Sequence, residues 1–135
     1  MIIHQSQPTH NSCVSACIAM LAGVPATEVT ERFNDAYHSQ EDPNIIFRML
    51  EAYNIEAVPR SSHAGNVHPG QVVIACVPSL NIVGGNHAVI LDYSTEEFKV
   101  FDPAEGIPGK KFYTTETLGG FTIDFNVFSF PAKEN

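Results

Sequence analysis

Basic residues are scarce in this chain, and so are cysteines and long apolar runs. Seven Lys and Arg face 15 Asp and Glu, which gives a formal net charge of -8. Because phosphate binding needs a basic face, this balance argues against a protein that coats nucleic acid. The chain also lacks the basic amphipathic helix of a membrane-surface binder, so we expect no membrane partner.

The cysteines are only Cys13, Cys17 and Cys76. Such a small, odd number argues against a secreted disulfide framework, and Cys13 and Cys17 lie too close on one helix to bridge easily. No apolar run approaches the roughly 18 residues of a membrane span, and the first residues lack the regions of a signal peptide. We expect a protein of the cytosol, or one delivered into a target-cell cytosol by a non-classical route.

What the chain does have fits one α+β domain over residues 1–135, with a helical part packed on an antiparallel sheet. Apolar residues make up 44% of the 135 positions. Apolar patterns and caps predict helices over 12–22, 28–37 and 44–53. β-Branched runs predict strands over 71–77, 86–93, 97–102, 110–114 and 121–130, and Pro and Gly predict a loop over 59–70.

The first predicted helix is apolar around nearly its whole circumference, so it should be buried in the centre of the fold. Asn11 or Ser12 can cap it, and Gly23 can close it. Thr27 is expected to cap the second helix, with Val29 on the inner side of that helix.

Cys13 lies in the first turn of the first predicted helix, where the field of the helix N-terminus favours a thiolate. It is our candidate nucleophile, although a core cysteine is the simpler alternative. Cys17 lies one turn further among apolar neighbours and is interpreted as a core residue.

His87 is the candidate general base, because it opens a strand directly after two glycines, Gly84 and Gly85. The alternative is an ordinary structural histidine. The remaining histidines fall in tails, helix ends or loops and show no catalytic pattern; they are His4, His10, His38, His63 and His68.

Strand pairing suggests the group that orients His87. A short turn over 94–96 should join strands 86–93 and 97–102 in a hairpin, which brings residues near 102 and 103 opposite His87. Asp102 is therefore the candidate, although a plain turn residue before Pro103 is the alternative. Asp92 competes, but it should point to the other face of the strand.

Gln7, six residues before Cys13, can direct its side-chain N–H at an oxyanion beside the backbone amide of Cys13, and Gln5 is the fallback donor. A zinc site from Cys13, Cys17, His10 and His87 is an alternative use of these residues, although the spacing is not that of a usual zinc knuckle.

Taken together, Gln7-Pro-Thr-His-Asn-Ser-Cys13, Asn86-His87-Ala88-Val89-Ile90 and Phe101-Asp102-Pro103-Ala104-Glu105-Gly106 resemble the motifs of the C39 family. These papain-like cysteine peptidases trim double-glycine leaders. The resemblance implies a papain-like fold, a triad of Cys13, His87 and Asp102, an oxyanion-hole role for Gln7, and no cofactor or metal.

Two features differ from the family pattern. The family usually has Asp-Cys-Gly at the nucleophile, whereas this chain has Ser12-Cys13-Val14, and Val14 is expected to add bulk near the cleft. Family members are commonly fused to a transporter, whereas this chain resembles free-standing peptidase toxins that are delivered into other cells. A cognate immunity protein would then be a partner.

The implied reaction is acyl transfer, with a protein or peptide substrate and, as a hypothesis, cleavage after Gly-Gly. Glutamine deamidation or transglutamination on the same triad is one alternative. A non-catalytic C39-like binding module is another. The substrate protein and the oligomeric state leave no trace in the sequence, and a monomer is the default.

Overall fold

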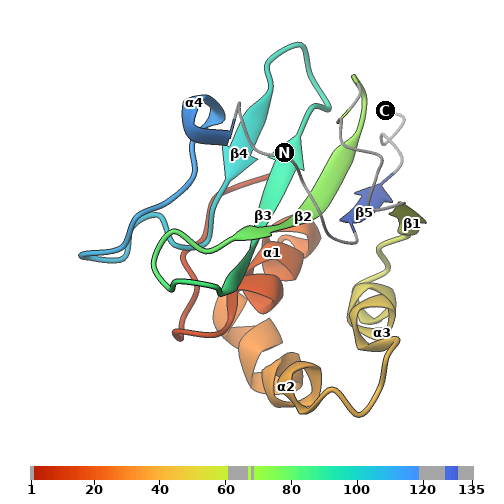
Figure 1. Cartoon of the computed structure of the whole chain (residues 1–135). Helices are drawn as coiled ribbons and strands as arrows, with labels where there is room; N and C mark the ends of the chain where they lie inside the picture. Colours follow the sequence, from red (N-terminus) through yellow and green to blue (C-terminus); the bar gives the residue numbers. More distant parts are fainter. Residues whose placement is uncertain (1, 61–66, 68, 119–126, 131–135) are drawn as a thin grey trace.

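The computed structural model describes residues 2–60, 67, 69–118 and 127–130. The described elements are α1 (Cys13–Ala22), α2 (Ala26–Ser39), α3 (Ile45–Ala52), β1 (Val58–Arg60), β2 (Val72–Pro78), β3 (Asn86–Asp92), β4 (Lys99–Phe101), α4 (Thr115–Leu118) and β5 (Val127–Phe130). The strands form one antiparallel sheet in the order β1-β5-β2-β3-β4. Helices α1, α2 and α3 gather on one side of this sheet (Figure 1). The predicted α+β architecture is confirmed.

Helix α1 is the centre of the fold, as its all-round apolar surface predicts. Residues 14–20 are all buried, and the side chains of α1 pack against β2 and β3 through Ile74, Ala88 and Ile90. Gly23 ends the helix in a left-handed conformation (φ 72°) and donates its N–H to the carbonyl of Ala19, as expected for a glycine C-cap. Val14 is only 7% exposed, and its side chain belongs to the core. Its effect on the shape of the cleft stays a prediction.

Helix α2 begins earlier than predicted, and Thr27 does not cap it. Pro25 is the N-cap residue, and Thr27 is an exposed residue of the first turn. The orphan N–H of Ala26 donates instead to Oε1 of Gln5 at 2.7 Å, while Nε2 of Gln5 donates to the carbonyl of Val24 at 2.7 Å. The cap therefore comes from a residue about twenty positions away. Val29 is fully buried, as predicted.

Replacing Gln5 by Ala should destabilise the protein by about 1–3 kcal/mol, because the N–H of Ala26 and the carbonyl of Val24 lose their partner. Urea unfolding of the variant measures this as a lower midpoint. Gln40→Asn, at an exposed left-handed position (φ 56°), is the control and should leave the midpoint unchanged. An unchanged midpoint for Gln5→Ala would show that water replaces the glutamine without cost.

The predicted hairpin between the runs 86–93 and 97–102 is confirmed, with Ile90 opposite Phe101 and Asp92 opposite Lys99. Its connection is longer than expected, because β3 ends at Asp92 and β4 begins only at Lys99. The two faces of β2 and β3 enter different cores. Residues 74, 88 and 90 face the helices, whereas Val73, Val89 and Leu91 pack with Tyr113 on the opposite face.

The predicted strand over 110–114 is wrong. The backbone groups of this segment bond to side chains instead of a neighbouring strand: the N–H of Lys111 donates to Oδ1 of Asn81, and the N–H of Tyr113 donates to Oδ2 of Asp102. A short helix, α4, follows at Thr115. Of the residues in this segment, Tyr113 is buried, as its place in an apolar run suggests.

Other predictions fall at the limits of the described chain. Of the predicted loop over 59–70, residues 59 and 60 belong to β1, residues 67, 69 and 70 are outside any strand or helix, and the others lie outside the described residues. Of the predicted strand over 121–130, residues 127–130 form β5, and 121–126 are likewise not described. Within the described ranges, no helix is long and apolar enough to cross a membrane.

Candidate active site

Cys13 is the first residue of α1 and is half-buried at the edge of the core that this helix forms. The first amide groups of a helix have no partner within it, and the helix dipole places partial positive charge at this end. Both effects stabilise negative charge on the Cys13 sulfur, or on an oxygen bound next to it.

His87 lies between Cys13 and Asp102. Its Nε2 is 2.5 Å from Oδ1 of Asp102, and its side chain is 13% exposed. Burial alone would lower the pKa of His87, but hydrogen bonds to Asp102 and Cys13, together with the charges of these two groups, outweigh burial and raise it from 6.5 to about 9. His87 is therefore an imidazolium at neutral pH.

Asp102 occupies one ring nitrogen of His87. The contact is made by Nε2, which leaves Nδ1 for a second partner, and Cys13 lies close enough to His87 to raise its pKa. The carboxylate on Nε2 fixes the rotation of the ring. This is the arrangement that a thiol nucleophile with an oriented base requires.

Asp102 is held by several donors in a dry site, with only 1% of its side chain exposed. Oδ1 also accepts the N–H of Ala104 at 2.8 Å, and Oδ2 accepts the N–H of Tyr113 at 2.7 Å. Each carboxylate oxygen thus accepts one backbone N–H, and Oδ1 also bonds to Nε2 of His87. The backbone bonds hold the carboxylate in position independently of its contact with His87.

The route from Asp102 to His87 differs slightly from the predicted one. If the observed hairpin register is extended beyond Phe101, Asp102 lies opposite Val89, and His87 lies opposite Ala104. Asp102 is thus a diagonal neighbour of His87, at a spacing of about 7–8 Å that the two side chains can span. The competitor Asp92 lies at the far end of β3, where its Oδ1 accepts two hydrogen bonds from Ser94.

Gln7 lies in an N-terminal segment that is bound to the turn after Asp102. The N–H of Gln7 donates to the carbonyl of Pro103 at 2.9 Å, and Oγ of Ser6 donates to the carbonyl of Glu105 at 2.6 Å. The side-chain Nε2 of Gln7 donates to the carbonyl of Thr9 at 2.8 Å, which leaves its second N–H hydrogen for another acceptor. Oε1 is buried and has no partner among the described residues.

Gln5, the fallback donor for the oxyanion, caps the start of α2. Oε1 and Nε2 of its amide both bind backbone groups there. Two other predicted bystanders also serve the structure: Nε2 of His4 bonds to the carbonyl of Asp102 at 2.8 Å, and His38 bonds to the carbonyl of Asn11. His10 is exposed, and His63 and His68 lie outside the described residues.

The other two cysteines are thiols in less polar surroundings. Cys17 is fully buried, and this burial, with the charge of Cys13 as a smaller cause, raises its pKa well above the ordinary value. Burial also raises the pKa of Cys76 on β2. The zinc alternative gains no geometric support, because Cys13, Cys17, His10 and His87 are all described and form no group that could hold a metal ion.

Sequence reasoning missed two residues that build the site. Tyr113 supplies a backbone donor to Asp102, and its hydroxyl donates to the carbonyl of Pro78 at 2.5 Å. His4 binds the carbonyl of Asp102. Neither residue has a local pattern that would have revealed it, because both contacts join segments that are distant in the sequence.

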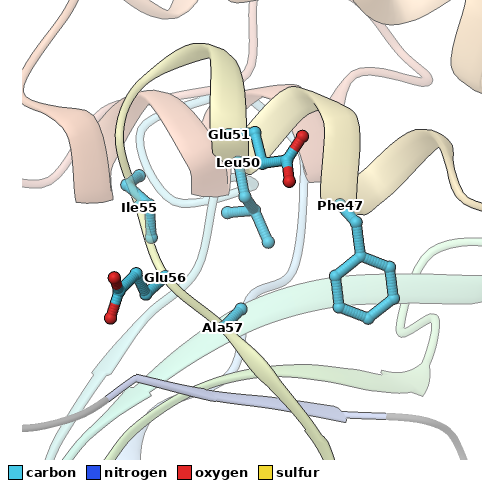
Figure 2. Close-up of a pocket in the computed structure, with 6 residues that line it drawn as sticks. All are labelled: Phe47, Leu50, Glu51, Ile55, Glu56 and Ala57. Carbon is cyan, nitrogen blue, oxygen red and sulfur yellow. The ribbon is translucent and has the colours of Figure 1, made fainter.

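A pocket of about 360 Å³ lies away from these residues, between α3 and the segment that follows it (Figure 2). It is lined by Phe47, Leu50, Glu51, Ile55, Glu56 and Ala57. None of these is a candidate site residue, and the carboxylates of Glu51 and Glu56 are its only ionisable groups. The pocket is therefore separate from the Cys13 site.

Comparison with known proteins supports the fold. No family model matches the chain, and no curated protein matches it. The structure is similar to the crystal structure of a double glycine motif protease from an AMS/PCAT transporter in complex with the leader peptide. The TM-score is 0.59 at 17% sequence identity, over 97% of this chain and 92% of that chain. The predicted fold, helices packed on an antiparallel sheet as in C39-like peptidases, is the fold of this protein.

Proposed function

We propose that this protein is a cysteine peptidase in which Cys13 is the nucleophile, His87 the general acid and base, and Asp102 the residue that orients His87. The observation that carries the proposal is the position of His87, which bonds to the buried Asp102 carboxylate through Nε2 and lies close enough to Cys13 for the thiol to raise its pKa. The protease with a similar fold supports the same reaction class.

The raised pKa of His87 suits this chemistry. With His87 protonated at neutral pH and Cys13 at a helix N-terminus, a thiolate–imidazolium pair is favoured. The thiolate attacks a peptide carbonyl, and a carbon–sulfur bond forms. The carbon–nitrogen bond then breaks as His87 gives its proton to the departing amine. Water, deprotonated by His87, hydrolyses the thioester and restores the thiolate.

The oxyanion formed by attack needs donors near the sulfur. We assign this task to the backbone N–H of Cys13 and to the second N–H hydrogen of Gln7, whose first hydrogen binds Thr9. Gln7 is tied to the Asp102 turn through the carbonyl of Pro103. The donor and the orienting carboxylate would therefore be positioned by one shared segment.

The test is to map new protein N-termini by mass spectrometry after the protein is incubated with a bacterial lysate. Pretreatment with iodoacetamide, with the modified cysteine identified by mass, is the control. The proposal predicts new termini that disappear when Cys13 is alkylated. If no termini appear and a glutamine side chain gains about 1 Da, the same site acts as a deamidase and the peptidase proposal is wrong.

Glycines on the acyl side of the cleaved bond are the proposed preference, following the double-glycine specificity named for the similar structure. A peptide with Gly-Gly before the cleavage site should then be cut faster than its Ala-Ala analogue. Equal kcat/KM values for the two peptides would remove this preference from the proposal and leave the peptidase chemistry untouched.

Gln7→Ala should lower kcat by about 10²-fold with little change in KM, because the oxyanion donor acts in the transition state rather than on the bound substrate. Steady-state kinetics on a cleaved peptide measures this. Gln5→Ala is the matched control, since Oε1 and Nε2 of Gln5 both bind backbone groups at the start of α2 and their loss should affect stability rather than kcat. Equal kcat values for Gln7→Ala and the unchanged protein would leave the Cys13 amide as the working donor.

A further inference from the structure

Residues 4–7 lie along the turn over residues 102–106, and we call residues 4–7 the strap. Neither segment belongs to a strand or helix, so no backbone ladder joins them. Three hydrogen bonds do so instead: Nε2 of His4 to the carbonyl of Asp102 at 2.8 Å, Oγ of Ser6 to the carbonyl of Glu105 at 2.6 Å, and the N–H of Gln7 to the carbonyl of Pro103 at 2.9 Å. Because the bonds are so few, each one matters for the position of the strap.

The turn is a fixed base for the strap, and it leaves room for the Ser6 hydroxyl. The N–H of Glu105 donates to the carbonyl of Asp102 at 3.0 Å, which closes the turn. Gly106 follows in a left-handed conformation (φ 90°), and a Cβ there would lie 2.7 Å from Oγ of Ser6. Any other residue at this position would be strained and would also displace the hydroxyl from the carbonyl of Glu105.

The amide of Gln7 depends on this attachment, because few contacts of its own fix it. Nε2 donates to the carbonyl of Thr9, and Oε1 is buried without a partner among the described residues. The next residue, Pro8, has no N–H, so it cannot donate a backbone bond that would hold the chain after Gln7. The main chain at Gln7 is therefore held by its own N–H and by the residue before it, Ser6.

Small displacements of an oxyanion donor have large effects on rate. The donor has to lie about 2.7–3.1 Å from the developing negative oxygen, and a misplacement of about 1 Å can cost roughly 10²-fold. The turn that receives the strap begins at Asp102, whose carboxylate bonds to His87. The turn is thus a common reference for the orienting carboxylate and for Gln7.

We propose that Ser6 is a positioning residue for the reaction. Its hydroxyl holds the strap on the turn through the carbonyl of Glu105, and this fixes the amide of Gln7 beside Cys13. The inference rests on the proposed peptidase function and adds a residue that acts only through Gln7. The bond is exposed, and water competes with such a bond, so its loss should change kcat more clearly than stability.

The test is a double-mutant cycle of Ser6→Ala and Gln7→Ala in the full chain, with kcat and KM measured on a cleaved peptide. Ser6→Ala alone should lower kcat about three- to tenfold and leave KM nearly unchanged, because the amide it positions acts in the transition state. In the Gln7→Ala background the same change should alter kcat by less than about 1.5-fold, since no amide remains to be positioned.

Two further variants separate positioning from a general loss of structure. Ser6→Thr keeps the hydroxyl, and its kcat should stay within about twofold of the parent. Ser39→Ala is the matched control: Ser39 is also exposed, and its hydroxyl donates to a carbonyl, that of Ala36, at 2.8 Å, but it is the last residue of α2. This control should leave kcat unchanged. Urea unfolding shows whether each variant is folded.

Four results would overturn the proposal. Ser6→Ala could have the kcat of the parent, it could lower kcat by the same factor with and without Gln7, or it could be unfolded, which would make the hydroxyl structural. The fourth result is a Ser6→Thr variant as slow as Ser6→Ala. Failure of the peptidase function appears differently, because the unchanged protein would then produce no new N-termini.

Discussion

Cys13→Ala is expected to abolish peptide cleavage, with kcat falling at least about 10⁴-fold, while Cys17→Ala keeps most of the activity. The two thiols are one helical turn apart on α1, so the pair compares one reactive with one structural position on the same element. Cys13 is half-buried at the helix N-terminus beside His87, whereas Cys17 is fully buried among apolar neighbours.

The measurement is kcat/KM on a cleaved peptide, together with urea unfolding of both variants. Cys17→Ala removes a buried sulfur and should cost about 1 kcal/mol of stability without changing the chemistry. Cys13→Ala should cost little stability, because its side chain is only partly packed. Cleavage that survives Cys13→Ala would exclude Cys13 as the nucleophile.

Asp102→Asn should lower kcat by about 10³–10⁴-fold while the protein still folds. The amide keeps the shape of the carboxylate but loses its charge, so His87 is no longer held as an imidazolium. The asparagine side chain also has only one acceptor oxygen, whereas the two oxygens of Asp102 bind His87, Ala104 and Tyr113. We expect a stability loss of about 1–3 kcal/mol from the donor that is left unpaired.

A pH profile separates orientation of His87 from a general loss of structure. In the unchanged protein, activity should fall as pH rises through about 9, because His87 then loses the proton that the leaving amine needs. Asp102→Asn removes a group that raises this pKa while burial continues to lower it, so the alkaline limb should move to lower pH. The profile would not shift if Asp102 had only a structural role.

Asp92→Asn is the matched control for Asp102→Asn. Asp92 is also buried and also accepts hydrogen bonds, but they come from Ser94 at the far end of β3. An asparagine keeps the Oδ1 acceptor there, so activity and pH profile should be unchanged. If Asp92→Asn and Asp102→Asn lost activity to a similar degree, the loss in Asp102→Asn would come from lower stability and not from a change in the orientation of His87.

The amino-acid sequence determined those features that depend on local patterns. An apolar circumference followed by Gly23 is enough to define a buried helix and its end, and the helix begins at Cys13. Two β-branched runs around a polar turn define the hairpin of β3 and β4. The hairpin places Asp102 near His87, because hairpin partners follow from spacing along the chain. Only the packing of α1 on β3 brings Cys13 to this pair.

Only the tertiary structure decided the contacts that join distant segments. Gln5 rather than Thr27 caps α2, Tyr113 holds Asp102, and Asn81 binds Lys111. In each case a side chain and a backbone group from another part of the sequence form a hydrogen bond. Such bonds carry no periodic signal, so the segment over 110–114 was predicted as a strand when its donors in fact face Asn81 and Asp102.

The same distinction applies to function. The sequence predicted the residues of a thiol site, and the fold brings them together with His87 between Asp102 and Cys13. The catalytic roles and the delivery of the protein as a toxin stay predictions. The exposure of Ile82 and Val83 was invisible in the sequence, because they look like any apolar pair until the structure shows their side chains in solvent. Exposure depends on how distant segments pack, and local patterns do not contain that information.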